Sequence, residues 1–219
     1  FMGDALMALW NAPLNDPDHP NHACAAALRM VDEMTVLNDR WKKVAETAGR
    51  PFKPVKLGIG LNTGLCCVGN LGSETRFDYS VIGDNVNVAA RLEGQSKTYD
   101  LVIIAGEETA ARATKFAFLE LDLLKVKGKT EATRIFALMG DDKFLQSDTF
   151  KKLAAKHQEF LSKYRGMDWD GAETLLEECE ALNIQSLTGL YTLYRERIAA
   201  FSLTPPPENW DGTAQATSK

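Results

Sequence analysis

The chain lacks the features that define membrane proteins and nucleic-acid-binding proteins. Its 219 residues contain no apolar run near the ~18 residues that a membrane span needs, and no signal peptide opens it. Lys and Arg number 25 against 30 Asp and Glu, a formal net charge of −5. This balance argues against binding duplex nucleic acid by neutralising its phosphates. We therefore expect a cytoplasmic segment that contacts neither membrane nor nucleic acid.

Cysteine is also sparse. The four cysteines are Cys24, Cys66, Cys67 and Cys179. The adjacent pair is not a C-x-x-C motif, and four thiols in a chain of this length form no disulfide framework. We expect all four to be reduced and buried, and to behave as small hydrophobic residues of a cytosolic protein.

The combination of His19, His22 and Cys24 raises the alternative of a metal site. These residues fall where a helix is expected to begin, around Pro20, and no second cluster of ligands follows them. The polar start of a helix is therefore the favoured interpretation.

The chain begins inside an apolar stretch. Phe1–Asp4 leads directly into Ala5–Trp10, which has the pattern of a core strand and follows no initiator methionine. We therefore expect residues of a longer polypeptide to precede Phe1.

The first two thirds of the chain alternate between helix and strand patterns. Apolar residues recur at spacings of three and four over 23–44, which predicts a long helix that ends near Gly49. Strands are expected at 56–62 and 65–68, joined as a hairpin, and Asp84 is expected to cap a later helix. The other expected elements are strands at 78–82, 101–105, 116–126 and 133–139 and helices at 84–97 and 107–112. This order predicts an α+β sandwich with a mixed or antiparallel sheet.

The pattern changes after residue 142. Helical periodicity is expected at 149–164, 170–182 and 188–201, with no strand between them. We therefore divide the chain into an α+β domain at 1–142, a helical hairpin extension that resembles a single tetratricopeptide unit at 143–203, and an irregular tail at 204–219.

The stretch from Arg76 to Glu93 carries the side chains of greatest chemical interest. If a helix begins at Asp84, Asn87 and Arg91 are four residues apart and lie on one face. A guanidinium offers a fixed fork of donors for phosphate oxygens, and an amide can orient a ribose. By spacing alone, an exposed polar pair without a ligand is the favoured interpretation.

Glycines recur between residues 60 and 72. Gly60, Gly64, Gly69 and Gly72 match neither G-x-x-x-x-G-K-[ST] nor a strand-linked G-x-G-x-x-G. We interpret them as glycines of tight turns and of close backbone approach.

Six segments taken together carry a family resemblance. In chain order they are FMGDA at 1–5, GIGLNTG at 58–64, VGNLGS at 68–73, DYSVIGD at 78–84, VNVAARLE at 86–93 and VKGK at 126–129. With them, residues 1–139 resemble the catalytic domain of bacterial class III nucleotidyl cyclases, the adenylate/guanylate cyclase superfamily. The resemblance implies a ferredoxin-like α+β sandwich without its N-terminal strand and helix, followed here by a small all-α region.

The resemblance implies a role for the first matching segment. Asp4 is similar to the second of two aspartates that hold two Mg²⁺ or Mn²⁺ ions per site, and Gly3 is expected to contact the substrate. The first aspartate is expected upstream of Phe1. The resemblance therefore implies an incomplete metal site in this fragment, and it does not imply that the fragment is active by itself.

The other implied site residues follow along the chain. Asn87 resembles the residue that orients the ribose, and Arg91 resembles the cation that stabilises charge at the α-phosphoryl group. Lys127 resembles the clamp on the terminal phosphates. Ser80 stands at a base-reading position, where a hydroxyl favours ATP but also permits GTP.

The activity implied is formation of 3′,5′-cyclic AMP and pyrophosphate from ATP at a homodimer interface. Two alternatives stay open: the same chemistry on GTP, and a catalytically silent domain that binds nucleotide or regulates a partner. The resemblance also implies that upstream segments can anchor the parent protein in the inner membrane.

Overall fold

The fold combines a central mixed sheet with helices on both of its faces. The structure is a computed structural model that describes residues 3–73, 75–125 and 132–215. Within these residues, the strands are β1 (Ile59–Leu61), β2 (Cys67–Ser73), β3 (Arg76–Ile82), β4 (Ile103–Gly106), β5 (Ala117–Lys125), β6 (Thr133–Gly140) and β7 (Thr213–Gln215). The helices are α1 (His19–Thr47), α2 (Asp84–Tyr99), α3 (Glu107–Arg112), α4 (Asp142–Leu145), α5 (Asp148–Arg165), α6 (Trp169–Glu180), the 3₁₀ turn η1 (Gln185–Leu187) and α7 (Thr188–Leu203).

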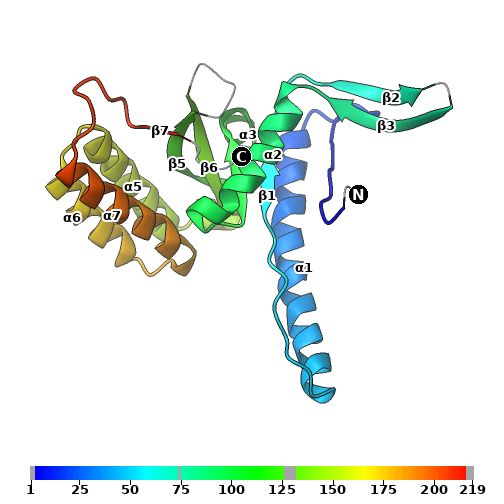
Figure 1. Ribbon diagram of the computed structural model, residues 1–219, viewed down its shortest axis with the longest axis horizontal. Coiled ribbons are helices and arrows are strands. Elements are labelled where there is room, and N and C mark those ends of the chain that lie inside the picture. Colours follow the sequence, from blue (N-terminus) through cyan, green and yellow to red (C-terminus); the bar gives the residue numbers. More distant parts are fainter. Residues whose placement is uncertain (1–2, 74, 126–131, 216–219) are drawn as a thin grey trace.

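The main sheet has the strand order β1-β4-β6-β5-β7. β1 and β4 are parallel, β6 is antiparallel to both of its neighbours, and β5 and β7 are parallel. Side chains of β4 alternate between the faces: Ile104 packs with α2 and the C-terminal helices, whereas Ile103 and Ala105 pack with α1. The expected α+β sandwich is therefore confirmed, with helices covering both faces (Figure 1).

The expected hairpin between 56–62 and 65–68 is wrong. β2 pairs with β3 in a separate antiparallel ribbon, and β1 pairs instead with β4. Parallel pairing of β1 with β4 lets Leu61 join Ile103 in the core under α1, whereas Leu65 is 94% exposed. Burial of apolar side chains therefore selects β4 as the partner of β1.

The expected core strand at Ala5–Trp10 is also wrong. The segment makes a single bridge at Ala5 and then continues without regular structure, and Leu6 is 56% exposed. No neighbouring strand in the described part of the chain takes up a ladder of its backbone hydrogen bonds. An apolar run without such a partner does not form a strand.

Two of the four cysteines depart from the expected burial. Cys24 and Cys179 are buried, but Cys66 and Cys67 are exposed at the start of β2, and all four are free thiols. Burial raises the pKa of the Cys24 thiol to about 12, so this thiol stays protonated. The exposed pair lies outside the sheet because β2 belongs to the projecting ribbon (Figure 1).

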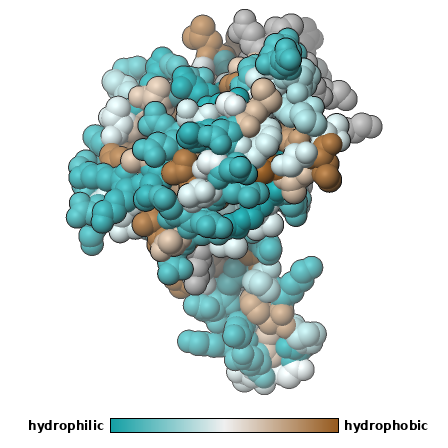
Figure 2. Space-filling view, turned by 90° about the vertical axis from the view of Figure 1, so that its left-hand side faces the viewer, coloured by the Kyte–Doolittle hydropathy of each residue, from teal (hydrophilic) through white to brown (hydrophobic). Residues whose placement is uncertain are grey.

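The C-terminal helices share their core with the sheet. Residues of α5, α6 and α7 belong to one buried cluster with side chains of β5, β6 and α2. Figure 2 shows the outer side of this region, whose surface is mainly hydrophilic with scattered apolar residues. The helices therefore turn their apolar faces toward the sheet, as amphipathic helices do.

The tail expected to be irregular contains a strand. β7 extends the sheet next to β5, and the ring of Trp210 packs against Tyr164 with centroids 5.3 Å apart. The indole Nε1 donates to the carbonyl of Thr213 at 3.3 Å. The contact of Trp210 with α5 holds the tail near the sheet, so that the backbone of the tail can pair with β5. Three residues are too few for the apolar periodicity of the sequence to predict this strand.

No helix among the described residues combines the length and apolar character that a membrane crossing requires.

Candidate functional site

Helix α2 presents the two side chains predicted to matter most. Asn87 and Arg91 are both exposed, whereas Val88 and Leu92 on the opposite face are buried in the core. The helix is therefore fixed by one face and leaves an amide and a guanidinium side by side on the other. No carboxylate in the described ranges forms an ion pair with Arg91. Its charge is available to an anionic ligand.

The start of α2 departs from the expected capping. The N-cap residue is Gly83, with a φ of 148°, and it makes no side-chain cap bond. Asp84 is the first residue of the helix and is not its cap. A φ in this region is readily adopted only by glycine. The sharp turn at Gly83 lets the chain leave β3 and enter α2 at once, which joins the strand carrying Ser80 directly to the helix carrying Asn87.

A glycine in β1 brings the sheet against the backbone of α2. A Cβ added at Gly60 would lie 2.0 Å from the carbonyl oxygen of Ala89 and 2.4 Å from the amide nitrogen of Glu93. Ala89 lies between Asn87 and Arg91 along the helix. Because Gly60 has no side chain, the backbone of α2 can lie this close to β1, and Gly60 therefore sets the distance between α2 and the sheet.

Two asparagines fix the loop at the start of α2, and the sequence assigned no role to either. The side chain of Asn62 donates to the backbone carbonyl of Asn85 at 3.1 Å and to its side-chain oxygen at 3.2 Å. Asn85 in turn donates to the carbonyl of Leu65 at 3.0 Å. These bonds tie the end of β1 to the first turn of α2. Asn62 stands inside the matched segment 58–64, and Asn85 lies between the matched segments 78–84 and 86–93.

Ser80 lies on the two-stranded ribbon formed by β2 and β3. It is half-buried and stands opposite Gly69 in the antiparallel register. Farther along the ribbon, Phe77 is 62% and Tyr79 50% exposed. Figure 1 shows the ribbon projecting away from the main sheet. Large exposed apolar side chains on a projecting ribbon mark a surface suited to another protein chain.

The first matching segment is not joined to the others. Gly3, at a φ of 64°, and Asp4 form an exposed turn. In the described part of the chain, no hydrogen bond or ion pair links Asp4 to Asn87 or Arg91. Over the same residues, no group of three or more His, Cys, Asp or Glu could hold a metal ion. Lys127 lies outside the residues that the structure describes.

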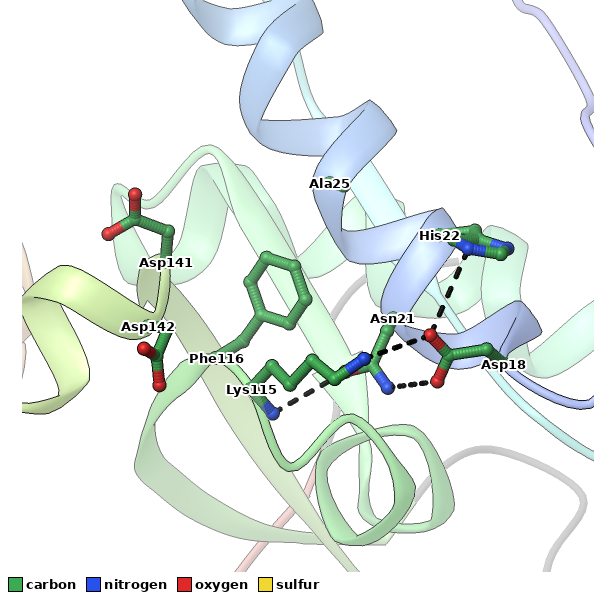
Figure 3. Close-up of a pocket in the computed structure, with 8 residues that line it drawn as sticks. All are labelled: Asp18, Asn21, His22, Ala25, Lys115, Phe116, Asp141 and Asp142. Carbon is green, nitrogen blue, oxygen red and sulfur yellow. Dashed lines mark hydrogen bonds and ion pairs between the residues drawn. The ribbon is translucent and has the colours of Figure 1, made fainter.

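A depression in the surface lies elsewhere. Figure 3 shows Asp18 and Asn21 at the start of α1 and Lys115 before β5 on its rim. Lys115 Nζ donates to Asp18 at 3.1 Å, and the ring of His22 interacts with Asp16 at 2.8 Å. Lys115 and Asp18 neutralise each other, and none of the predicted site residues lines the depression. His22 thus belongs to the polar start of a helix.

Comparison with known proteins identifies the family. Residues 1–140 match the family described as the adenylate and guanylate cyclase catalytic domain. This match spans more than half of the chain, so the protein belongs to the class III cyclase family, as the resemblance predicted. Its fold, a mixed α+β sheet covered by helices, agrees with the solved catalytic domains of that family.

Two relatives that are similar in sequence are adenylate cyclases. The chain is 35% identical over 141 residues to Adenylate cyclase 1 of Rhizobium meliloti, covering 64% of this chain and 20% of the relative. It is 35% identical over 142 residues to the adenylate cyclase of Anabaena cylindrica, covering 62% and 26%. The chain therefore spans about a quarter or less of these relatives.

Two solved structures share the fold. The adenylyl cyclase CyaB from P. aeruginosa aligns with a TM-score of 0.52 and 29% identity, covering 59% of this chain and 64% of that one. The guanylyl cyclase Cya2 aligns with a TM-score of 0.53 and 28% identity, covering 64% and 68%. Both purine specificities thus occur among structures similar to this chain.

Proposed function

We propose that residues 1–142 form the catalytic domain of an adenylate cyclase, which converts ATP into 3′,5′-cyclic AMP and pyrophosphate. The observation that carries the proposal is the pairing of Asn87 and Arg91 on the exposed face of a helix whose other face is buried. A rigid support with a charged group directed outward is what phosphoryl transfer requires, because its transition state is stabilised mainly by fixed positive charge.

In this reaction the ribose 3′-oxygen attacks the α-phosphorus, and the 3′-hydroxyl proton passes to solvent. The bond from the α-phosphorus to the oxygen that bridges it to the β-phosphorus breaks, and pyrophosphate leaves with that oxygen. Arg91 stabilises the charge that develops on the α-phosphoryl oxygens through its fork of N–H donors. Asn87, one helical turn earlier, orients the ribose through its amide. Lys127 is proposed to bind the terminal phosphates, and Gly3 to let the substrate approach the backbone closely.

ATP is favoured over GTP by two facts. The curated relatives described above are named adenylate cyclases, and the hydroxyl of Ser80 can accept a hydrogen bond from the adenine amino group. GTP is the second candidate, because a hydroxyl can also donate and one similar solved structure is a guanylyl cyclase.

A homodimer is proposed as the active form. Asp4 lies on a turn without any contact to Asn87 or Arg91 in the described residues of one chain. Two copies related by a two-fold axis can place Asp4 of one against α2 of the other, which creates two equivalent sites. The apolar surface of the β2–β3 ribbon, including Phe77 and Tyr79, supports such an association.

Divalent metals are generally used by this family. The described residues do not fit a complete metal site, since Asp4 offers one exposed carboxylate and no further ligand joins it. We propose Asp4 as one ligand of Mg²⁺ or Mn²⁺. Two bound ions would lower the pKa of the 3′-hydroxyl.

The test is a steady-state assay of the purified intact protein that contains this chain, with ATP and GTP in parallel and with Mg²⁺ or Mn²⁺. We expect cyclic AMP and pyrophosphate in equal amounts, and a kcat/KM for ATP about tenfold or more above that for GTP. Preference for GTP would establish the guanylate cyclase alternative. Tight nucleotide binding without release of pyrophosphate would establish the silent domain instead.

A further inference from the structure

A buried ion pair joins the C-terminal helices to the main sheet. Nη1 of Arg197, on α7, donates to Oδ2 of Asp122, on β5, at 2.6 Å. The carboxylate is 1% exposed and the arginine side chain 19%. Oδ1 of the same carboxylate accepts the backbone amide of Leu123 at 2.9 Å. Both oxygens are thus occupied, which is the condition for a stable buried charge.

The same carboxylate also holds the end of helix α2. The hydroxyl of Tyr99, the last residue of α2, donates to Oδ2 of Asp122 at 2.7 Å, and its side chain is fully buried. Burial, together with the nearby Asp122 charge, raises the pKa of Tyr99 well above its ordinary value, so the hydroxyl remains a donor. The Arg197 guanidinium lies 5.9 Å from the Tyr99 ring centroid and 5.3 Å from that of Tyr194. One carboxylate oxygen therefore connects α2, β5 and α7.

A second contact between α7 and α2 lies at the first turn of α7. A Cβ added at Gly189 would lie 2.4 Å from the Cβ of Asp100. Asp100 is the C-cap residue of α2 and has a φ of 52°. The backbone of α7 thus packs directly against the C-terminal end of α2. The two contacts are eight residues apart on α7, so they fix the end of α2 at two separate points.

The opposite end of α2 is held by a different contact, the hydrogen bonds from Asn62 to Asn85 that join its first turn to the end of β1. Its N-cap, Gly83, makes no side-chain cap bond. Arg91 follows Asn85 by six residues, a distance of about 9 Å along the helix axis. If the Tyr99 end were released, a tilt of about 6° about the Asn85 end would move Arg91 by about 1 Å, and a misplacement of that size can cost about 100-fold in rate.

We propose that Arg197 is a positioning residue: through Asp122 it holds Tyr99, and so sets the orientation of the helix that carries Asn87 and Arg91. The α7 helix thereby takes part in forming the site without contacting substrate. The inference rests on the proposed function only for the role of α2; the attachment of α2 to α7 is independent of it.

The variants separate positioning from general stability. Arg197→Ala removes the ion pair, Arg197→Lys keeps the charge, and Tyr99→Phe removes only the bond from α2 and leaves the ion pair intact. Arg195→Ala is the matched control, because Arg195 is also on α7 and forms an ion pair, with Glu180 of α6, that does not reach α2.

We expect Arg197→Ala to lower kcat by about tenfold or more with KM for the nucleotide within about twofold. Tyr99→Phe should lower kcat by about threefold or more, Arg197→Lys should restore it to within about threefold of the original protein, and Arg195→Ala should leave it unchanged. If Arg197→Ala does not fold, Tyr99→Phe and Arg197→Lys decide the question.

Amide hydrogen exchange supplies a readout that needs no activity. Exchange of the α2 amides should accelerate about tenfold or more in Arg197→Ala and Tyr99→Phe but not in Arg195→Ala. Unchanged exchange in α2, or equal losses in the Arg195→Ala control, would overturn the inference. If the folded protein shows no cyclase activity, the proposed function fails, while exchange still decides whether Arg197 orders α2.

Discussion

Replacing Gly60 by alanine tests whether the distance between α2 and the sheet controls cyclase activity. The new methyl group would meet the carbonyl oxygen of Ala89 at 2.0 Å and the amide nitrogen of Glu93 at 2.4 Å. Both atoms are backbone, so no side-chain rotation can relieve the clash. The helix itself has to move.

The size of the movement follows from ordinary contact distances. Van der Waals contacts begin near 3.4 Å, so the backbone of α2 must retreat by more than about 1 Å at Ala89. Asn87 and Arg91 flank this point and move with it. We expect a loss in kcat of about 100-fold, as for a reacting group displaced by about 1 Å, and a loss in stability of about 1–3 kcal/mol from overpacking.

The assay measures kcat and KM for ATP alongside urea denaturation of the same protein. Gly94→Ala is the matched control, because Gly94 is on α2 and a Cβ there meets nothing within 4 Å. That substitution should keep activity and stabilise the helix by about 1 kcal/mol. A Gly60→Ala protein with more than half of the original kcat would refute the link between this contact and the site.

Three further outcomes are expected. Arg91→Ala should lower kcat by about 10²–10³ with dimerisation intact, whereas Lys97→Ala on the same helix should have little effect; retention of half the activity would contradict the role of Arg91. Burial lowers the pKa of His157 to about 4. The unfolded chain therefore binds a proton that the folded protein excludes, and stability should fall by roughly 2–3 kcal/mol as the pH drops from about 6.5 to 4.5. His157→Gln should flatten that decline in urea denaturation, and an unchanged pH profile would show that His157 is not its source. Trp210→Ala should cost about 2 kcal/mol and expose β7 to hydrogen exchange; a change below about 0.5 kcal/mol would mean that the tail needs no aromatic anchor.

Local patterns predicted the helices well. The stripe over 23–44 matches α1, and the expected helix at 107–112 coincides with α3. The three C-terminal helices lie within a few residues of their predicted bounds. An apolar helical face repeats every three to four residues, and this pattern can be recognised without knowing what the face packs against. In α1 the stripe is buried only near its start, at Ala27, whereas Trp41 and Val44 are exposed.

Strand pairing was harder to predict because it depends on distant partners. Nothing within residues 56–68 indicates that β1 pairs with β4 some forty residues later. The same holds for β7, whose three residues pair with β5 next to the contact between Trp210 and Tyr164 of α5.

In the candidate site, too, features within one helix could be predicted from the sequence, whereas contacts between distant segments could not. The spacing of Asn87 and Arg91 predicted a common helical face, and α2 provides it. The carbonyl and amide contacts of Asn62 and Asn85 could not be predicted, since they join segments more than twenty residues apart. The place of Asp4 relative to Arg91 depends on a second chain under our proposal, so it stays a prediction.

The shared core of the sheet and the C-terminal helices affects how this protein can be dissected. The family match ends at residue 140, yet Phe160, Leu176 and Tyr194 are fully buried against the same cluster as β5 and α2. A recombinant fragment trimmed at the family boundary would leave an uncovered apolar sheet face prone to aggregate. Inactivity of such a fragment would then report a damaged fold, so deletions that probe regulation should spare everything through β7.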